Sequence, residues 1–387
     1  MNIIEVSTTI HQKEFLLLPV RLYKNEKNWI RPLDSDIEEI FDKKKNKYFR
    51  HGECIRWLLI DDNKKTIGRV AAFIDKKLAR KHDQPTGGMG FFECIDDKDA
   101  AFLLFDTCKK WLAEREMEAM DGPINFGDRD RWWGLLVEGF TEPNYRMFYH
   151  FPYYKNLFEA YGFKDYFQQH TFFRKVIGPV SEGMEARADR ICKNPDYTFA
   201  HMQKNNLEKY AEDFRTIYNK AWVKHKTTNE FTKAQAMGFM KTMKPVLDEK
   251  IVWFAYYKNE PVAFFINLPE LNQIFKHVNG KMDLIGKIKF LWLKLRKSNH
   301  KMFGFVFGVV PEQQGKGLEA AITVVLKNFI QTEYKQYEDF EMNWIGDFNP
   351  KMFHVAEDIG ATVSKIHITY RKLFDDLKPF KRHPIIE

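Results

Sequence analysis

The feature that most constrains this 387-residue chain is an apolar strand followed by a glycine turn and a helix, over residues Phe303–Glu319. The strand part is almost entirely apolar, and the turn contains Gly315 and Gly317. Apolar residues then recur with helical spacing as far as Ile330. A helix that starts at such a turn leaves its first backbone N–H groups without partners, and its dipole favours negative charge. The pattern therefore predicts a binding site for a phosphate or pyrophosphate.

Length and composition indicate two folded domains of middling size. A chain of 387 residues is too long for one ordinary core, and a hydrophobic content of 44% excludes widespread disorder. The formal net charge of +8 favours an anionic ligand, nucleic acid or an acidic membrane surface, but soluble enzymes often carry a similar excess. No nucleic-acid-binding module is recognisable, so a nucleic-acid partner is not expected.

The cysteines argue against a metal centre or a disulfide framework. Cys54, Cys94, Cys108 and Cys192 are scattered and form no CxxC pair. The N-terminal residues lack a basic-then-apolar signal pattern, and no apolar run approaches the roughly 18 residues needed to span a bilayer. A reducing cytoplasm is therefore the expected location, and no metal site is expected.

The two halves of the chain predict the same mixed α/β order of elements. In the first half we expect helices at Gln12–Tyr23, directly after Asp96-Asp97 and at Tyr153–Tyr161, and strands at Ile55–Ile60, Thr66–Ile74, Gly90–Ile95, Met120–Asn125 and Leu135–Val137. In the second half we expect helices at Leu207–Trp222, Lys233–Leu247, after the glycine turn and at Pro350–Ile359, and strands at Tyr197–Met202, Ile251–Tyr257, Pro261–Leu268, Phe303–Val310, Phe340–Trp344 and Val363–Arg371.

The polar stretch Ile177–Arg187 suggests the boundary between the two halves. The prediction is an N-terminal domain over residues 1–177, which has Glu93-Cys94-Ile95-Asp96-Asp97 where the other half has its glycine turn. A C-terminal domain over residues 188–387 would carry the turn and a basic insert at residues 272–302.

The glycine turn resembles the signature of the GNAT acyltransferase superfamily: Gln or Arg, two residues, Gly, one residue, then Gly or Ala. Gln314, Gly317 and Glu319 fall on the three signature positions. The resemblance implies acetyl-CoA or a longer acyl-CoA as cofactor. It also implies these cofactor-binding residues: Val309 and Val310 for the pantetheine arm, the loop residues Gln314, Gly315, Lys316, Gly317, Leu318 and Glu319 for the pyrophosphate, and Asn349 nearby.

Two positions depart from the GNAT pattern. Glu319 replaces a small residue, and Ala356 stands where many GNAT enzymes have a tyrosine that acts as general acid. Further stretches resemble a bacterial family of tandem GNAT-like proteins, some of which are associated with N-acylation of long-chain sphingoid bases: Gly68–Ala72, Gly90–Glu93, Asp121–Phe126 and Gly134–Phe140. The fold class implied is α/β (α+β GNAT-like), with two consecutive GNAT-like domains, each a mixed central sheet flanked by helices.

Amine acylation needs a group that accepts a proton, because an alkylammonium has a pKa of about 10.4. Asp347 and His354 are the candidate catalytic residues, since they lie just before and within the helix next to the expected cofactor edge. The alternative is a helix N-terminal carboxylate and an ordinary surface histidine. Glu93 and Glu138 could be buried bases, or they could face outward or form structural ion pairs.

Aromatic pairs in the first half could line a groove for an acyl or lipid chain, although such clusters usually belong to a core: Trp132-Trp133, Phe148-Tyr149 and Tyr153-Tyr154. The insert 272–302 mixes apolar residues with lysines, a composition typical of a basic amphipathic helix on an anionic membrane. The alternative is a helix packed on its own domain with a solvated lysine face.

The favoured function is an acyl-CoA-dependent N-acyltransferase that transfers an acetyl or longer acyl group to an amine, either a small molecule or a lipid amine such as a sphingoid base. The first domain would help to shape the acceptor site. The second hypothesis is a degenerate GNAT pair that binds coenzyme A or a partner without turnover, as Ala356 and Glu319 would suggest. The third is a peripheral membrane or nucleic-acid binder that uses the basic insert.

Overall fold

The computed structural model describes residues 1–81, 84–222 and 230–386. In the first half the elements are β1 (Asn2–Glu5), α1 (Thr9–Leu22), α2 (Asp34–Phe41), β2 (Gly52–Ile60), β3 (Thr66–Asp75), β4 (Thr86–Cys94), α3 (Lys98–Ala113), β5 (Ala119–Gly122), β6 (Leu135–Glu138), α4 (Tyr154–Tyr161) and β7 (Lys164–Lys175). In the second half they are α5 (Glu182–Cys192), β8 (Tyr197–His201), α6 (Leu207–Trp222), α7 (Lys233–Met243), β9 (Val252–Tyr257), β10 (Glu260–Pro269), α8 (Asn272–Phe275), α9 (Leu284–Leu295), β11 (Lys301–Val309), α10 (Leu318–Thr332), β12 (Asp339–Gly346), α11 (Pro350–Asp358) and β13 (Thr362–Leu373).

The predicted helices and strands are all present, with shifted ends. Local chemistry explains several of their boundaries. Asp97 caps α3 by accepting a hydrogen bond from the backbone N–H of Ala100 at 2.8 Å, and Gly162 ends α4 in the left-handed conformation at φ 95°. The sequence patterns did not predict β1, α2, α5 or β7.

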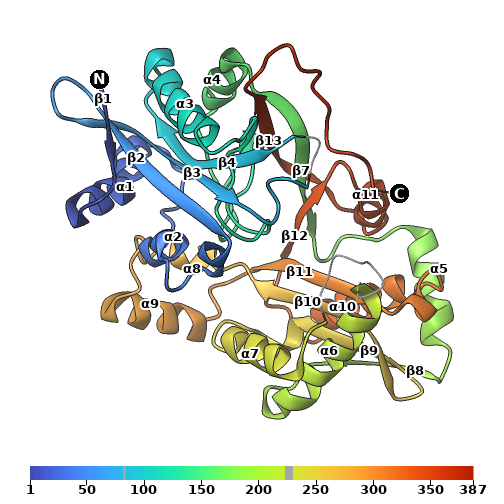
Figure 1. Ribbon diagram of the computed structural model, residues 1–387. Coiled ribbons are helices and arrows are strands. Elements are labelled where there is room, and N and C mark those ends of the chain that lie inside the picture. Colours follow the sequence, from blue (N-terminus) through green and yellow to red (C-terminus); the bar gives the residue numbers. More distant parts are fainter. Residues whose placement is uncertain (82–83, 223–229, 387) are drawn as a thin grey trace.

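The described strands form one 13-stranded sheet in the order β1-β2-β3-β4-β5-β13-β7-β12-β11-β10-β9-β8, with β6 also paired to β13. Each half contributes one parallel pair, β4 with β5 and β11 with β12, among antiparallel neighbours. The long strands β7, β12 and β13 cross the middle of the molecule and join the two halves (Figure 1).

The halves exchange their last strands. The β7 strand pairs with β12 of the second half, and β13 at the end of the chain pairs with β5 and β6 of the first half. The side-chain hydrogen bond from Thr369 to Gln169, 2.9 Å long, joins residues 200 positions apart. The division into residues 1–177 and 188–387 therefore stays a prediction, because these strands belong to neither half alone.

Helices cover both faces of the second half's sheet. Phe264 of β10 packs on Phe214 of α6, with ring centroids 4.9 Å apart, whereas its neighbour Phe265 lies with Leu326 of α10. Adjacent residues of a strand point to opposite faces. Accordingly α6 and α10 lie on opposite sides, and α5 packs along α10.

The first half has its own core between the sheet and α3 and α4. Its members are mostly aromatic or aliphatic side chains with almost no exposure, among them Phe92, Phe105 and Phe158. A smaller cluster on the other face includes Phe15 of α1 and Ile37 of α2. Many of the chain's aromatic side chains are therefore buried in these two cores, where they pack against one another.

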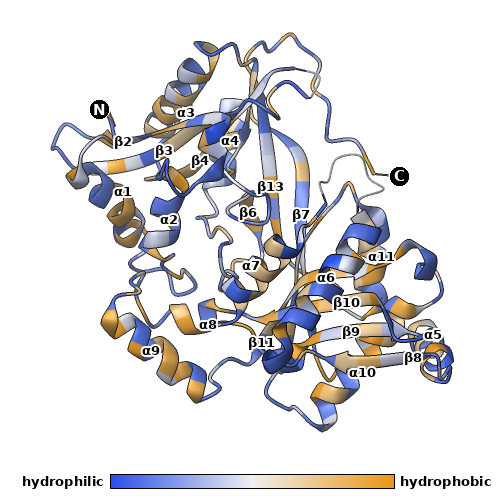
Figure 2. Cartoon of the chain, turned by 60° about the horizontal axis from the view of Figure 1, so that its bottom comes forward, coloured by the Kyte–Doolittle hydropathy of each residue, from blue (hydrophilic) through white to orange (hydrophobic). Residues whose placement is uncertain are grey.

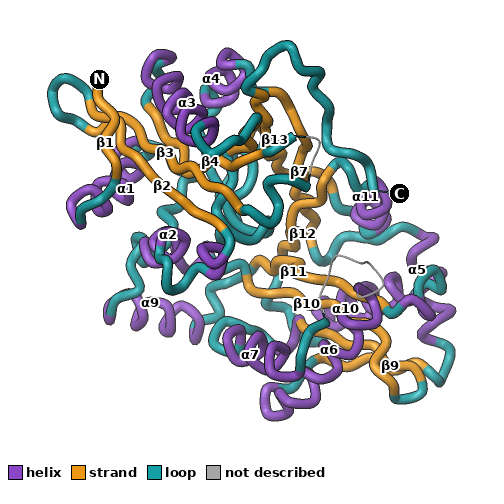
Figure 3. The backbone as a smooth tube through the Cα atoms, in the orientation of Figure 1, coloured by secondary structure: helices purple, strands orange, loops and turns teal. Residues whose placement is uncertain are grey.

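The insert 272–302 forms α8 and α9 at the edge of the molecule, where Figure 2 shows α9 as a largely hydrophobic helix. Figure 3 shows α9 at the outer edge of the molecule, below α2. The loop between β6 and α4 contacts this insert. Asn272 donates to the Pro143 carbonyl at 2.8 Å, and the Tyr145 N–H donates to Glu270 at 2.7 Å. None of the described helices is both long enough and apolar enough to cross a membrane.

Candidate active site

The glycine turn forms a tight connection between β11 and α10. Pro311–Gln313 make one 3-10 turn, and two glycines with positive φ follow, Gly315 at 72° and Gly317 at 96°. Gly317 is the N-cap of α10, so the helix begins at Leu318 without a capping side chain. Only glycine adopts a φ of 96° without strain, which explains its presence at the helix start.

The backbone N–H groups of residues 315–320 are the central feature of this turn. Within the described part of the chain, none of them donates a hydrogen bond of normal geometry to another residue. The N–H of Ala321 is the first to pair, with the Gly317 carbonyl at 3.1 Å. Unpaired amides at a helix start attract an anion, because they add hydrogen bonds to the positive end of the helix dipole.

Gln314 is engaged differently from the residues after it. Its backbone N–H donates to the Pro311 carbonyl, and its side-chain amide donates to the Val309 carbonyl at 3.0 Å. Gln314 therefore braces the turn against the end of β11. Of the predicted loop residues, Gly315, Lys316, Gly317, Leu318 and Glu319 retain free main-chain donors.

Two arginines of α5 approach the turn from the side. The Arg190 guanidinium donates to the Lys316 carbonyl at 2.8 Å, and the Arg187 side chain lies beside Gly317, where an added Cβ would come within 3.1 Å of it. Arg187 also pairs with Asp358 at 2.6 Å. Arg190 therefore adds positive charge beside the amides, whereas Asp358 balances the charge of Arg187. Sequence reasoning missed them, although Met184, Ala188 and Ile191 show the helical spacing of α5.

The sheet opens next to this turn. The parallel pairing of β11 with β12 stops at Gly304 and Met342. On its other side β11 pairs with β10, where the adjacent residues Ile266 and Asn267 face Val306 and Gly304; Phe305 therefore forms a bulge. The residues of β11 from Phe303 to Phe307 are partly exposed although the strand lies inside the sheet. Neighbouring strands that part in this way leave backbone groups available to a ligand.

The two predicted pantetheine-binding residues differ in orientation. The Val310 N–H donates to the Val262 carbonyl of β10 at 2.9 Å. In an antiparallel ladder hydrogen-bonded and non-hydrogen-bonded pairs alternate. The backbone of Val309, opposite Ala263, therefore points away from β10 and toward the opening. Val309 is available for such pairing through its N–H, whereas the N–H of Val310 is already paired.

The structure does not bring the two predicted catalytic residues together. Asp347 follows β12, and its carboxylate pairs with Arg382 at 2.6 Å. The His354 side chain is 81% exposed on α11 and pairs with Glu357 at 3.4 Å. Asn349 is the N-cap of α11 without a side-chain cap bond, and Ala356 is fully buried.

A cluster of buried charged side chains lies on β12 at the residue before Met342, where β12 parts from β11. It lies on the sheet face opposite to the one that α10 covers. Glu341 of β12, paired with Phe303, contacts the ammonium of Lys365 at 2.7 Å and that of Lys301 at 3.4 Å. Burial alone would raise the pKa of Glu341, but the two ammonium groups outweigh it and the pKa is lowered. Burial also lowers the pKa of Lys365. Such a cluster can hold or move a proton. Sequence reasoning did not single it out.

The two carboxylates singled out in the first half have structural surroundings. Glu93 is buried and accepts hydrogen bonds from the hydroxyls of Tyr23 and Tyr154 at 2.8 and 2.9 Å, with Arg69 3.5 Å away. Burial raises the pKa of Glu93. Glu138, at the end of β6, is exposed. Glu93 thus belongs to a structural ion pair, as the alternative reading stated.

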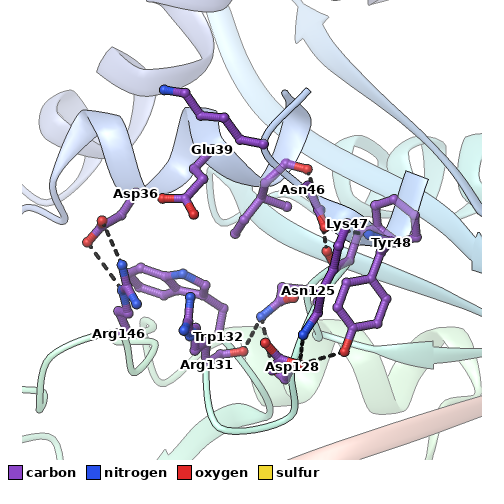
Figure 4. Close-up of a pocket in the computed structure, with 14 residues that line it drawn as sticks. Asp36, Glu39, Asn46, Lys47, Tyr48, Asn125, Asp128, Arg131, Trp132 and Arg146 are labelled. Carbon is purple, nitrogen blue, oxygen red and sulfur yellow. Dashed lines mark hydrogen bonds and ion pairs between the residues drawn. The ribbon is translucent and has the colours of Figure 1, made fainter. Parts of the chain in front are cut away.

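A polar cavity of about 220 Å³ lies in the first half, between α2 and the loop after β5 (Figure 4). Asp36 pairs there with Arg146 at 3.0 Å, and the Tyr48 hydroxyl donates to Asp128 at 2.6 Å. Trp132 is the only residue of the predicted aromatic pairs that lines this cavity. The other buried members, such as Phe148 and Tyr154, pack in cores, as the alternative stated. No residue of the glycine turn borders the cavity.

Comparison with curated proteins finds two relatives similar over nearly the whole chain, while no family model matches. The chain is 26% identical over 385 residues to a protein named bacterial ceramide synthase from Caulobacter vibrioides, covering 96% of this chain and 97% of the relative. It is 25% identical over 368 residues to protein YghO from Escherichia coli K12, covering 93% and 92% of the two chains.

Solved structures identify the fold. A tandem GNAT protein from the clavulanic acid biosynthesis pathway matches with a TM-score of 0.55 at 7% identity, covering 97% of this chain and 99% of that one. A GCN5-related N-acetyltransferase from Sphaerobacter thermophilus matches with a TM-score of 0.50 at 9% identity, covering 98% of each chain. The chain therefore has a tandem GNAT fold, and the fold class expected from the sequence is confirmed.

Proposed function

We propose that the protein is an acyl-CoA-dependent N-acyltransferase whose cofactor binds at the turn between β11 and α10. The observation that carries this proposal is the row of unpaired N–H groups at residues 315–320, next to the place where β11 and β12 part. The tandem GNAT fold supports it, as does the similarity to a protein named bacterial ceramide synthase.

The residues of the turn suit two parts of a coenzyme A, its pyrophosphate and its pantetheine arm. The free amides, the Lys316 ammonium and the Arg190 guanidinium would hold the pyrophosphate. The free N–H of Val309 would pair with the pantetheine arm. When bound, an acyl-CoA, either acetyl or longer, supplies an activated thioester carbonyl.

The amine must lose a proton during the reaction, and two sets of residues could accept it. Asp347 follows β12, although Arg382 holds its carboxylate, and His354 faces solvent. Glu341 and Lys365 lie beside the point where β11 and β12 part. We assign the proton-accepting role first to Asp347 and regard the buried pair as its competitor.

For the acceptor we propose a lipid amine of the sphingoid-base class. Ceramide is by definition an N-acylated long-chain amine, and one relative carries the name ceramide synthase over 97% of its length. A membrane contact through residues 272–302 would bring the protein close to such an acceptor.

A catalytically degenerate protein is the second candidate, and specific observations favour it. Both predicted proton carriers have other partners, and buried Ala356 occupies the position of the usual tyrosine. Such a protein would still bind coenzyme A at the turn.

Thiol release from acyl-CoA across a panel of amines separates the two candidates. The panel should contain acetyl-CoA and palmitoyl-CoA, each with a short polar amine and with a long-chain base. The proposal predicts thiol release with at least one amine, and no release by the Gly317→Glu variant. Coenzyme A binding without release for any amine would favour the degenerate protein, and absence of binding would contradict both.

A further inference from the structure

The outer face of α9 is apolar and exposed. Side chains that would normally be buried are 50–83% exposed along this single helix: Leu284, Ile285, Ile288, Leu291, Trp292 and Leu295. At about 100° per residue, these positions fall within an arc of roughly 120°. The outward side of the helix therefore carries an apolar arc as well as exposed lysines, so the alternative of a packed helix with a solvated lysine face describes it only in part.

The inner edge of α9 fixes the helix to the protein. Phe290 is 8% exposed and stacks on Phe275 of α8 with ring centroids 5.8 Å apart. Both pack in one cluster with Leu33 of the first half. Asp283 caps the helix by accepting from the Gly286 N–H at 2.9 Å. The helix is thus held in place, with its apolar arc pointing away from the core.

Basic residues border this arc on both sides. By the same helical geometry, Lys287 and Lys294 lie along one border and Lys289 and Arg296 along the other. The Lys294 ammonium donates to the Pro245 carbonyl, so Lys287 is the exposed cation on its side. The helix itself contains no acidic residue between Leu284 and Leu295. The Arg296 guanidinium lies 4.1 Å from the centroid of the Trp292 ring. An apolar arc between two rows of cations is the pattern of helices that lie in a membrane interface.

We propose that α9 docks the protein on an anionic lipid bilayer, with the apolar arc among the acyl chains and the bordering cations at the lipid phosphates. Charge favours this occupant over a second copy of the chain, because a symmetric dimer through α9 would place the same lysines against one another. Lipid headgroups instead complement the cations. Docking of this kind does not require acyl transfer, so it can hold even where the proposed activity fails.

Vesicle flotation tests the proposal on the full-length protein. The vesicles are pure phosphatidylcholine or phosphatidylcholine with 30% phosphatidylglycerol. The parent should float with the anionic vesicles and far less with the neutral ones, and each lysine should add about fivefold to the affinity. The Leu291→Glu/Trp292→Glu variant should lose at least tenfold in affinity.

Two matched variants make the test specific. Ile177→Glu/Leu377→Glu changes two apolar residues elsewhere that are even more exposed, at 75% and 94%, and should float like the parent. Lys287→Glu/Lys289→Glu should lose the preference for anionic vesicles. Melting curves and thiol release with a water-soluble amine should stay unchanged in the α9 variants, which separates docking from folding and from catalysis.

Three results would overturn the proposal. The first is equal flotation of the parent and the Leu291→Glu/Trp292→Glu variant. The second is no flotation of the parent with anionic vesicles. The third is a dimer in light scattering that this variant dissolves, since a second copy of the chain would then cover the arc.

Discussion

A single charge at Gly315 should weaken coenzyme A binding while the protein stays folded. Gly315 lies in the turn at φ 72°, and an added Cβ would meet no atom within 4 Å. Asn and Asp tolerate this left-handed conformation better than other residues. Gly315→Asp and Gly315→Asn therefore form a pair of nearly equal shape that differs only in charge.

The expected effect follows from Coulomb's law. At about 7 Å, and with an effective dielectric constant of about 20 to 80, two unit charges repel by about 0.6–2.4 kcal/mol. A Debye length of about 8 Å at physiological salt reduces this by about 60%, and the pyrophosphate carries two charges. The aspartate variant should therefore bind coenzyme A about 2- to 25-fold more weakly than the asparagine variant.

Titration calorimetry with coenzyme A measures this difference. The gap between the two variants should widen at low salt and nearly vanish at about 1 M salt, where the Debye length is about 3 Å. Both variants should melt at the same temperature. Equal affinities of the two variants at low salt would refute an anion site at the turn.

Three further perturbations test neighbouring parts of the structure. Arg190→Ala should weaken coenzyme A binding several-fold, because it removes a cation beside Lys316. Arg190→Lys keeps the charge and should bind more tightly than Arg190→Ala. An unchanged affinity of Arg190→Ala in calorimetry would show that Arg190 plays no part. His354→Ala should change turnover less than about threefold, since its side chain is 81% exposed; a loss of a hundredfold would place it in the reaction. Burial lowers the pKa of His367 to about 4 and that of His150 well below its usual value, so the unfolded chain binds their protons first as pH falls. The contribution of these two neutral histidines to the free energy of unfolding is fully present above about pH 6.5 and is lost as pH falls toward about 4. For His367 alone, about 2 kcal/mol of it is lost at about pH 5. Urea unfolding at pH 7.5 and pH 5 would contradict this if the two free energies were equal.

The sequence predicted those elements whose residues alternate or repeat with a clear period. The strand and helix around the glycine turn are confirmed almost to the residue. The β7 strand was missed because Gln168, Gln169 and His170 interrupt its apolar pattern. Gln169 is nevertheless fully buried, because it faces other polar groups such as Thr369.

The exchange of β7 and β13 could not be predicted, because it depends on pairing between residues nearly 200 positions apart. Strand patterns give the period of a strand but not its partner.

The candidate site divides in the same way. The free N–H groups at the turn could be predicted from the glycine spacing, because glycine permits the sharp turn and the first N–H groups of any helix lack partners within it. Side-chain roles depend on which way each residue points and on what it meets there. Arg382 reaches Asp347 from the end of the chain, and Glu341 meets Lys365 of another strand. Neither contact could be derived from the sequence.

Hydrogen–deuterium exchange over residues 311–322, with and without saturating coenzyme A, tests the central claim most directly. Amides that are free in the protein alone should exchange fast, and those of residues 315–320 should slow markedly once the cofactor is bound. Saturation with coenzyme A that leaves their exchange unchanged would contradict the account.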